Sequence, residues 1–144
     1  MCHQRALDIR LQHLTPHHED TWSSMHFTAH ILLLQDATLQ AQVLLREVYD
    51  STITVLGEYH FVTLMAAEKL AKCLSETQDS LAEALTIYLK ILHCRRSMMS
   101  IDNEEVVTSL SNVAASYCRL GKHRVRIVNV YFISNNNTHV AGRP

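Results

Sequence analysis

Hydrophobic residues recur along most of this chain at intervals of three and four positions, which is the spacing of amphipathic α-helices. Segments with this pattern are separated by short polar stretches such as Gln35-Asp36 and Gln78-Asp79. The pattern predicts helices over residues 20–34, 38–54, 61–76, 80–97 and 103–120. We therefore expect an all-α protein.

The third predicted helix and the fifth share one hydrophobic pattern, displaced by 43 residues. In the third helix it consists of Leu64, Ala67, Leu70, Ala71 and Leu74, and in the fifth of Val107, Leu110, Val113, Ala114 and Tyr117. The second and fourth helices match over the same interval, and a weaker copy lies 42 residues before the third helix, at His18, Thr21, Trp22 and Ala29. A fixed period of this length indicates a repeated helical hairpin. The sequence thus predicts two complete hairpins and the first helix of a third.

Residues that favour helix ends lie close to the predicted boundaries. Ser80 precedes Glu83 by three positions, and Asp102 precedes Glu105 by three. Both pairs fit a capping box, in which the first side chain accepts a hydrogen bond from a backbone N–H while the glutamate reaches back. Gly121 lies where the last predicted helix should end in a left-handed residue.

Composition and charge exclude several classes of function. The 144 residues include three glycines and two prolines, which disfavours folds with many tight turns and leaves no glycine pair at the spacing of a nucleotide-binding loop. The net charge of −1 provides no overall field for nucleic acid or for an anionic membrane, although the end of the chain from Arg119 onward is cationic. We therefore expect neither nucleic acid nor a membrane as a partner.

The cysteines and the first residues favour a cytoplasmic protein. The four cysteines, at positions 2, 73, 94 and 118, form no CxxC pair, and a hydrophobic fraction of 47% makes disulfide bonds unnecessary for a core. The longest aliphatic run, residues 31–34, is too short to span a bilayer, and the amino terminus lacks a signal-peptide stretch. We expect reduced thiols and cytoplasmic localisation.

Two stretches of the repeat resemble a known family. Residues 55–64 (VLGEYHFVTL) and 102–117 (DNEEVVTSLSNVAASY) are similar to the LGxxHPxTL and DHPxVAxSLxNLAxxY motifs of kinesin-light-chain-type tetratricopeptide repeats. Residues 121–123 (GKH) resemble the GKY that closes the first helix in that family, and residues 83–88 (EALTIY) contain pairs similar to its EA and LY pairs. The resemblance covers about residues 17–123, and several elements of the motif recur in register in at least two copies of the repeat.

The resemblance implies a right-handed α-α superhelix, the solenoid of tetratricopeptide repeats. Residues 17–123 would form an array of two and a half repeats, preceded by an N-terminal segment over 1–16 and followed by a non-repeat tail over 124–144. In this family the first helices line a concave face, which the resemblance implies holds an extended peptide segment of a partner protein. The implied function is a non-catalytic interaction module or scaffold.

Asn112 and Lys69 are the candidate peptide-binding residues. Asn112 matches the asparagine of the family motif, and its amide could both donate to and accept from a peptide backbone. Lys69 occupies the equivalent position one repeat earlier, where it would favour an acidic ligand. A simpler interpretation of each stays open: Asn112 bonds to a neighbouring helix, and Lys69 is a solvated surface charge. The sequence also departs from the family where Glu19 and Phe61 replace its proline.

The end of the chain departs from the repeat pattern. The third repeat has no second helix of the family type, and residues 124–133 (RVRIVNVYFI) are rich in β-branched side chains, which favours an irregular or strand-like tail. Either this tail covers the array or the product is truncated, and we favour truncation. An uncapped last repeat with exposed apolar side chains predicts self-association, so a self-assembling fragment without a peptide ligand is the alternative function.

Catalytic and metal sites find little support in the sequence. His26 and His30 lie four positions apart, as on zinc-binding helices, but nothing fixes a third ligand beside them. Cys73 and Cys94 each adjoin a basic residue that could lower the thiol pKa, yet cysteine is also a common buried residue. We expect no catalytic residue, no metal and no cofactor.

Overall fold

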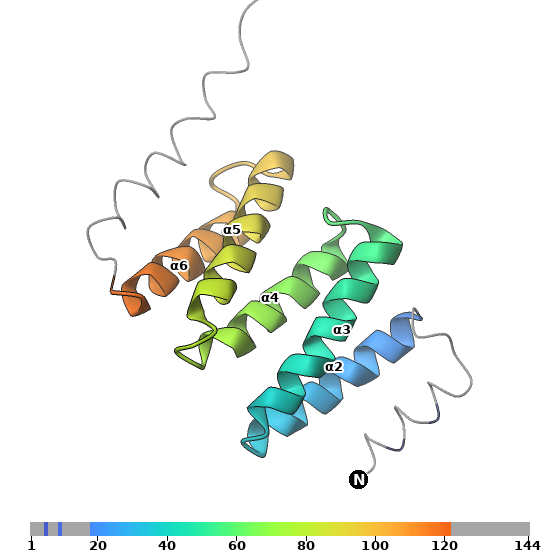
Figure 1. The fold of residues 1–144 in the computed structure, drawn as a ribbon. Coiled ribbons are helices and arrows are strands. Elements are labelled where there is room, and N and C mark those ends of the chain that lie inside the picture. Colours follow the sequence, from blue (N-terminus) through green and yellow to red (C-terminus); the bar gives the residue numbers. More distant parts are fainter. Residues whose placement is uncertain (1–4, 6–8, 10–17, 122–144) are drawn as a thin grey trace, which may run out of the picture.

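The computed structural model describes residues 5, 9 and 18–121, and this part contains five long α-helices (Figure 1). They are α2 (Glu19–Leu34), α3 (Thr38–Leu56), α4 (Phe61–Ser75), α5 (Leu81–Met98) and α6 (Glu104–Arg119). Each begins and ends within two residues of its predicted bounds, so the helices expected from the sequence are confirmed. None of the described residues lies in a strand, and the tail expected over 124–144 lies outside them.

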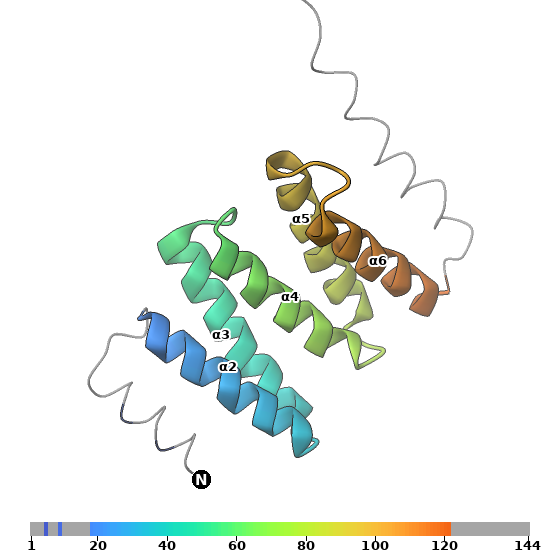
Figure 2. The ribbon, with the colours of Figure 1, turned by 180° about the vertical axis from the view of Figure 1, so that it is seen from behind.

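Each helix packs against the next, from α2 through to α6. α2 and α3 form one hairpin, α4 and α5 form a second, and α6 begins a third. Figures 1 and 2 show the three first helices, α2, α4 and α6, in one layer, with α3 and α5 in the other. The predicted solenoid of stacked helical hairpins is confirmed. We call the exposed side of α2, α4 and α6 the first-helix surface.

The larger of two hydrophobic clusters in the described residues runs through the stack from Ala29 of α2 to Val113 of α6. It includes Leu74 of α4 and Ile91 and Leu92 of α5, each at most 2% exposed. Burying an aliphatic side chain of this size contributes about 1.5–3 kcal/mol, and a hairpin of this kind can bury its apolar stripe only by stacking on its neighbours. Although their buried faces are apolar, none of the described helices is long and apolar enough to cross a membrane.

The three first helices begin in the same way. Their N-cap residues are His18 for α2, His60 for α4 and Asn103 for α6, which occupy one position of the repeat. Each has an extended backbone, and its side chain accepts a hydrogen bond from the N–H two residues later, at 3.2 Å for both histidine Nδ1 atoms and 2.9 Å for the asparagine Oδ1. Such a cap contributes about 0.5–2 kcal/mol. The caps therefore repeat together with the helices.

The capping boxes expected from the sequence are wrong. Asn103 caps α6, one residue later than the predicted Asp102. Ser80 precedes α5, but its side chain makes no capping hydrogen bond, because a ψ of 0° departs from the extended backbone that aims a cap at the following N–H groups. The prediction for Gly121 is confirmed, since this residue follows α6 with a φ of +68°.

Candidate peptide-binding surface

Two hollows lie on the first-helix surface, one on each flank of α4. The α2–α4 hollow has a volume of about 460 Å³ and the α4–α6 hollow a volume of about 330 Å³, within the range of ligand pockets. Lys72 of α4 and Glu76, the residue that follows α4, line both hollows. The two hollows therefore adjoin along α4 and together extend across three helices.

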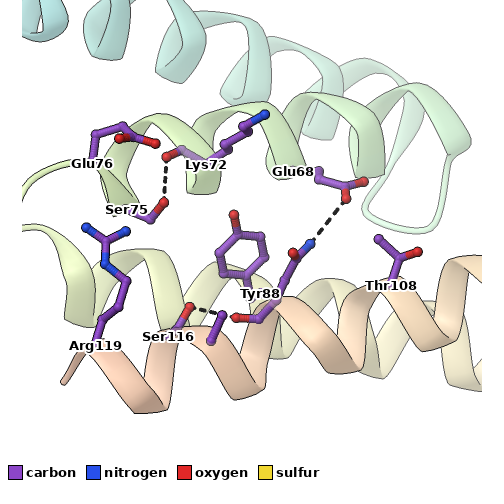
Figure 3. A pocket seen from close by; sticks show the side chains of 10 residues that line it. Glu68, Lys72, Ser75, Glu76, Tyr88, Thr108, Ser116 and Arg119 are labelled. Atoms are coloured by element: carbon purple, nitrogen blue, oxygen red, sulfur yellow. Dashed lines mark hydrogen bonds between the residues drawn. The ribbon is translucent and has the colours of Figure 1, made fainter. Parts of the chain in front are cut away.

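Polar side chains of α4 and α6 line the α4–α6 hollow, together with a tyrosine of α5 (Figure 3). Lys72 comes from α4 and Glu76 from its C-cap, whereas Asn112 and Arg119 come from α6. Burial raises the pKa of Tyr88, which is 6% exposed, so this side chain stays a neutral phenol. The hollow thus combines charges of both signs with an amide and an aromatic ring.

Asn112, predicted from the sequence as a peptide-binding residue, lines this hollow. Its Nδ2 donates to Oε1 of Glu68 on α4 at 3.4 Å. The bond to a neighbouring helix, one of the two interpretations of the sequence, is therefore present. It uses only part of the amide, which has two N–H donors and an acceptor oxygen, so contact with a ligand remains compatible with it.

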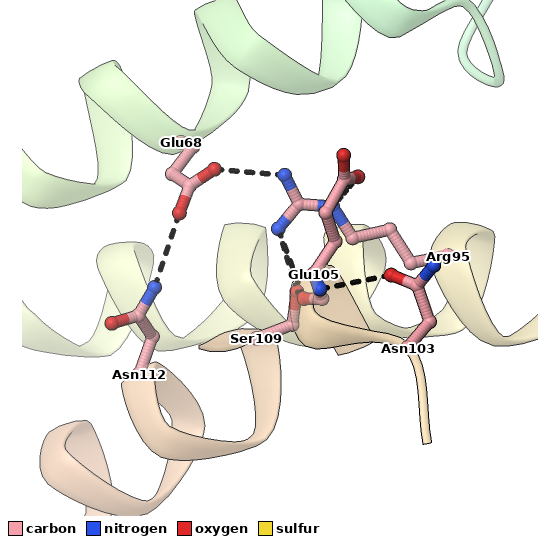
Figure 4. A network of polar contacts seen from close by, with 6 residues as sticks. All are labelled: Glu68, Arg95, Asn103, Glu105, Ser109 and Asn112. Carbon is pink, nitrogen blue, oxygen red and sulfur yellow. Dashed lines mark hydrogen bonds and ion pairs between the residues drawn. The ribbon is translucent and has the colours of Figure 1, made fainter. Parts of the chain in front are cut away.

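Glu68 and Asn112 belong to a polar network centred on Arg95 of α5 (Figure 4). Arg95 is 5% exposed. Its Nη2 donates to Oε2 of Glu68 at 2.9 Å, its Nη1 donates to Oγ of Ser109 at 2.7 Å, and its Nε forms an ion pair with Oε2 of Glu105 at 3.4 Å. A buried charge requires such partners. The network joins α4, α5 and α6 and holds Glu68 beside Asn112.

Sequence analysis did not identify Arg95 or Glu68. One signal was present, because Arg95 lies four positions after Ile91 and three after Leu92, on the apolar stripe of α5. A charged residue on a buried face needs a partner of opposite charge. The identity of that partner depends on how the hairpins stack, since Glu68 is 27 positions away.

Lys69, the second predicted site residue, lines the α2–α4 hollow and not the hollow that contains Asn112. Asn112 and Lys69 each face the first helix of the preceding repeat, as expected for equivalent positions of a repeat. Beside Lys69 the hollow contains Lys72 of α4 and His26 and His30 of α2. The two candidate residues therefore belong to adjoining hollows, one repeat apart.

The surroundings of His26 keep its imidazole neutral at pH 7. Burial, and then the positive charge of Lys69, lower the pKa of His26 to about 4. Its Nδ1 is buried and has no hydrogen-bond partner among the described residues. His26 therefore adds no positive charge near neutral pH to that of the lysines lining the α2–α4 hollow.

The described residues offer no activated nucleophile among their buried thiols and no group of metal ligands. Burial raises the pKa of Cys73 and of Cys94, which opposes formation of a thiolate despite their basic neighbours. His26 and His30 line one hollow, but no three His, Cys, Asp or Glu side chains in the described part are grouped to hold a metal ion.

No family model and no curated protein matches the sequence, but solved structures match the fold. Nearly identical TPR-like repeats from Podosopora anserina, assigned to a kinesin light chain, superpose with a TM-score of 0.77 at 16% identity, covering 95% of this chain and 66% of that chain. A second crystal structure of those repeats, with one substitution, gives 0.77 at 16% identity, covering 94% and 65%. BtubC (BKLC) from P. vanneervenii gives 0.75 at 14% identity, covering 99% and 57%.

At these identities the likeness concerns the fold alone. The chain spans less than two thirds of the length of each of these structures. The superpositions agree with the repeat period and with the stacking of α2 to α6 in hairpins. The chain therefore has the solenoid fold of kinesin-light-chain-type tetratricopeptide repeats, the family that its sequence motifs resemble.

Proposed function

We propose that the chain is a non-catalytic protein-interaction module that holds an extended peptide segment of a partner protein on its first-helix surface. The observation that carries this proposal is the pair of adjoining hollows across α2, α4 and α6. An extended peptide advances about 3.3 Å per residue and directs alternate side chains to opposite sides, so a short segment can place side chains in both hollows. The likeness to TPR-like repeats supports an interaction module.

In the α4–α6 hollow, Asn112 is the group proposed to contact the peptide backbone. Its bond to Glu68 orients the amide, with Nδ2 toward α4 and the carbonyl oxygen available to a peptide N–H. Arg95 in turn holds Glu68 at 2.9 Å. A side chain positioned in advance loses less conformational entropy when a ligand binds. Contact with the backbone gives affinity for peptides of many sequences.

In the α2–α4 hollow, Lys69 and Lys72 are proposed to favour an acidic side chain of the ligand. Both are exposed and line the hollow, so their ammonium groups remain hydrated until the ligand arrives. His26 adds no charge near pH 7, because its pKa is about 4. Attraction between exposed charges is screened by salt, so affinity should fall as ionic strength rises.

The proposed setting is the cytoplasm. Cys73, Cys94 and Cys118 are free thiols, which persist in a reducing compartment. The net charge of −1 supports a protein ligand over nucleic acid, whose binding depends on phosphate contacts by many basic residues.

The test is selection of peptides from a random display library on the full chain, followed by calorimetry of the selected peptide. We expect affinity to fall about tenfold in Lys69→Glu and about three- to tenfold in Asn112→Ala, the size of effect of one charged or polar contact. Lys90→Glu is the matched control, because Lys90 is exposed on α5 in the other layer. This variant should bind the peptide as the wild type does.

Two results would contradict the proposed function. One is failure to select any peptide on a sample whose circular dichroism shows the expected helices. The other is a selected peptide whose affinity is changed equally by Lys69→Glu and Lys90→Glu, since the first-helix surface would then not be the binding site.

A further inference from the structure

One position of the repeat holds a carboxylate in the α4–α6 hollow and a histidine in the α2–α4 hollow. In the α4–α6 hollow, Nδ2 of Asn112 donates to Oε1 of Glu68 at 3.4 Å, so the pair joins a donor to an acceptor. One repeat earlier the equivalent residues are Lys69, 43 positions before Asn112, and His26, 42 positions before Glu68. Both line the α2–α4 hollow. An ammonium group can only donate, so Lys69 needs an acceptor from His26 or from a ligand.

His26 meets the α2–α4 hollow through its Nε2. Its Nδ1 is enclosed and has no partner among the described residues, which leaves Nε2 as the ring nitrogen that a ligand can reach. Because burial and the charge of Lys69 lower the pKa of His26 to about 4, its imidazole is neutral near pH 7 and carries one N–H. Buried N–H groups without a partner are rarer in folded proteins than buried acceptors without one, which places the proton on Nε2. His26 is therefore a second donor beside Lys69.

We propose that His26 is a further ligand-contacting residue, whose Nε2–H donates to the same side-chain carboxylate of the peptide that Lys69 attracts. This inference rests on the proposed function, because it names the group that the peptide places in the α2–α4 hollow. A carboxylate only accepts and has two oxygens, so one oxygen can bond to each donor. The ligand thereby supplies the acceptor that Glu68 provides in the α4–α6 hollow.

The distribution of charge places the carboxylate at the His26 end of the hollow. α2 and α4 run side by side in the same direction, and the acidic residues that line the hollow, Asp36 and Glu76, follow their C-terminal ends (Figures 1 and 2). At a rise of about 1.5 Å per residue, Asp36 lies roughly 15 Å beyond His26, and Glu76 lies roughly 10 Å beyond Lys69. Lys72, three residues after Lys69, adds a second cation to the lining. A ligand carboxylate is therefore attracted toward His26 and Lys69 and repelled from the opposite end.

Nitrogen-15 NMR of the labelled full chain near pH 7 tests the state of the imidazole. The shifts of the two ring nitrogens of His26 should show a neutral ring with its proton on Nε2. A proton on Nδ1, or a charged ring, would overturn the proposal. This result does not require a bound peptide, so it is independent of the proposed function.

Calorimetry tests the contact, with a peptide selected from the display library and amidated at its C-terminus so that only side chains supply carboxylates. His26→Leu, which has no donor, should weaken binding about three- to tenfold, the effect of one hydrogen bond. His26→Gln should bind within about twofold of the wild type, because the glutamine amide again offers an N–H to the hollow. His93→Leu is the matched control and should bind as the wild type does, because His93 is exposed on α5 in the other layer.

Replacing the acidic residues of the peptide by alanine, one at a time, separates a contact from a structural effect. One of these peptides should bind the wild type and His26→Leu equally, because it lacks the carboxylate that His26 contacts. If the unaltered peptide binds both proteins equally, or if the loss in His26→Leu persists with every alanine peptide, the role of His26 is overturned while the proposed function stands. Failure to select any peptide on a folded sample would overturn both.

Discussion

The two junctions between first helices use equivalent positions but differ in chemistry. At the α4–α6 junction Glu68 lies beside Asn112, and their side chains share a hydrogen bond. At the α2–α4 junction the equivalent residues are His26 and Lys69. There Lys69 opposes protonation of His26, whose Nδ1 has no partner among the described residues.

The second helices account for much of this difference. α5 carries Arg95 where α3 carries Thr52, 43 residues earlier. Arg95 reaches both neighbouring first helices through Glu68 and Ser109. Thr52 is fully buried and donates within α3, to the carbonyl oxygen of Tyr49 at 2.9 Å.

The two junctions share their buried apolar positions and differ in their polar ones. Both junctions keep the buried residues that stack one hairpin on the next, because each repeat depends on its neighbours for its core. Their polar residues follow no such requirement. One junction has become a fixed network, while the other leaves two lysines and a neutral imidazole around a hollow.

The largest expected effect concerns the arginine that distinguishes the two junctions. Arg95→Ala should lower the free energy of unfolding by about 2–3 kcal/mol, because it removes the charged hydrogen bonds to Glu68 and Ser109, while the two carboxylates, 30% and 41% exposed, recover part of their hydration. Thr52→Ala, at the equivalent position, should cost about 1–2 kcal/mol. Urea unfolding followed by circular dichroism measures both. Equal losses would show that the network does not stabilise the α4–α6 junction.

A smaller effect should appear as a pH dependence of the α2–α4 junction. The native state keeps His26 neutral down to about pH 4, whereas the unfolded chain binds a proton below its ordinary pKa of 6.5. Stability should therefore fall as the pH drops from 6.5 to 4. The full pKa difference corresponds to roughly 3 kcal/mol, which partial exposure reduces to about 1–2 kcal/mol.

Urea unfolding at several pH values, with His26→Gln as the comparison, isolates this contribution. The variant should lose less stability than the wild type over the same interval, because the remaining titrating groups are common to both. Identical pH profiles would mean that His26 is not desolvated at the junction.

The helix caps should contribute about equally in the second and third repeats. His60→Ala and Asn103→Ala should each lower the free energy of unfolding by about 1 kcal/mol, since each leaves one N–H without its cap. Ser80→Ala is the control and should change stability by less than about 0.5 kcal/mol, because Ser80 makes no capping hydrogen bond. A large loss in Ser80→Ala would contradict the assigned cap positions.

The smallest expected effect is the influence of Lys69 on the pKa of His26 at the α2–α4 junction. Lys69→Met should raise the pKa of His26, but leave it below 6.5, because burial is the larger cause of the shift. An NMR titration of the imidazole measures this change, and Lys90→Met on α5 should leave the titration unaltered. A return to 6.5 in Lys69→Met would show that charge, not burial, dominates.

Most of the fold could be predicted from the sequence, because apolar spacing reports directly which side of each helix is buried. Leu70 and Val113, aligned by the 43-residue period, are both buried as the period requires. The same pattern could not distinguish Leu64, which is 5% exposed, from Val107, which is 50% exposed, since burial at this position depends on what packs against the helix.

The candidate site was predicted only in part. The motif resemblance placed Asn112 and Lys69 on first helices, and both line hollows of the first-helix surface. It could not predict the network around Arg95, because Glu68, Arg95 and Ser109 meet only after three helices have packed. The shift of His26 was missed for the same reason, since burial between repeats has no local signal in the sequence.

The most direct test of the account follows the backbone and side-chain NMR signals of the labelled full chain as a selected peptide is added. It asks whether the three first helices present one ligand-binding surface. We predict that the largest changes fall on the residues lining the two hollows, including the side-chain amide of Asn112. Changes confined to α3 and α5, with both hollows unaltered, would contradict this prediction.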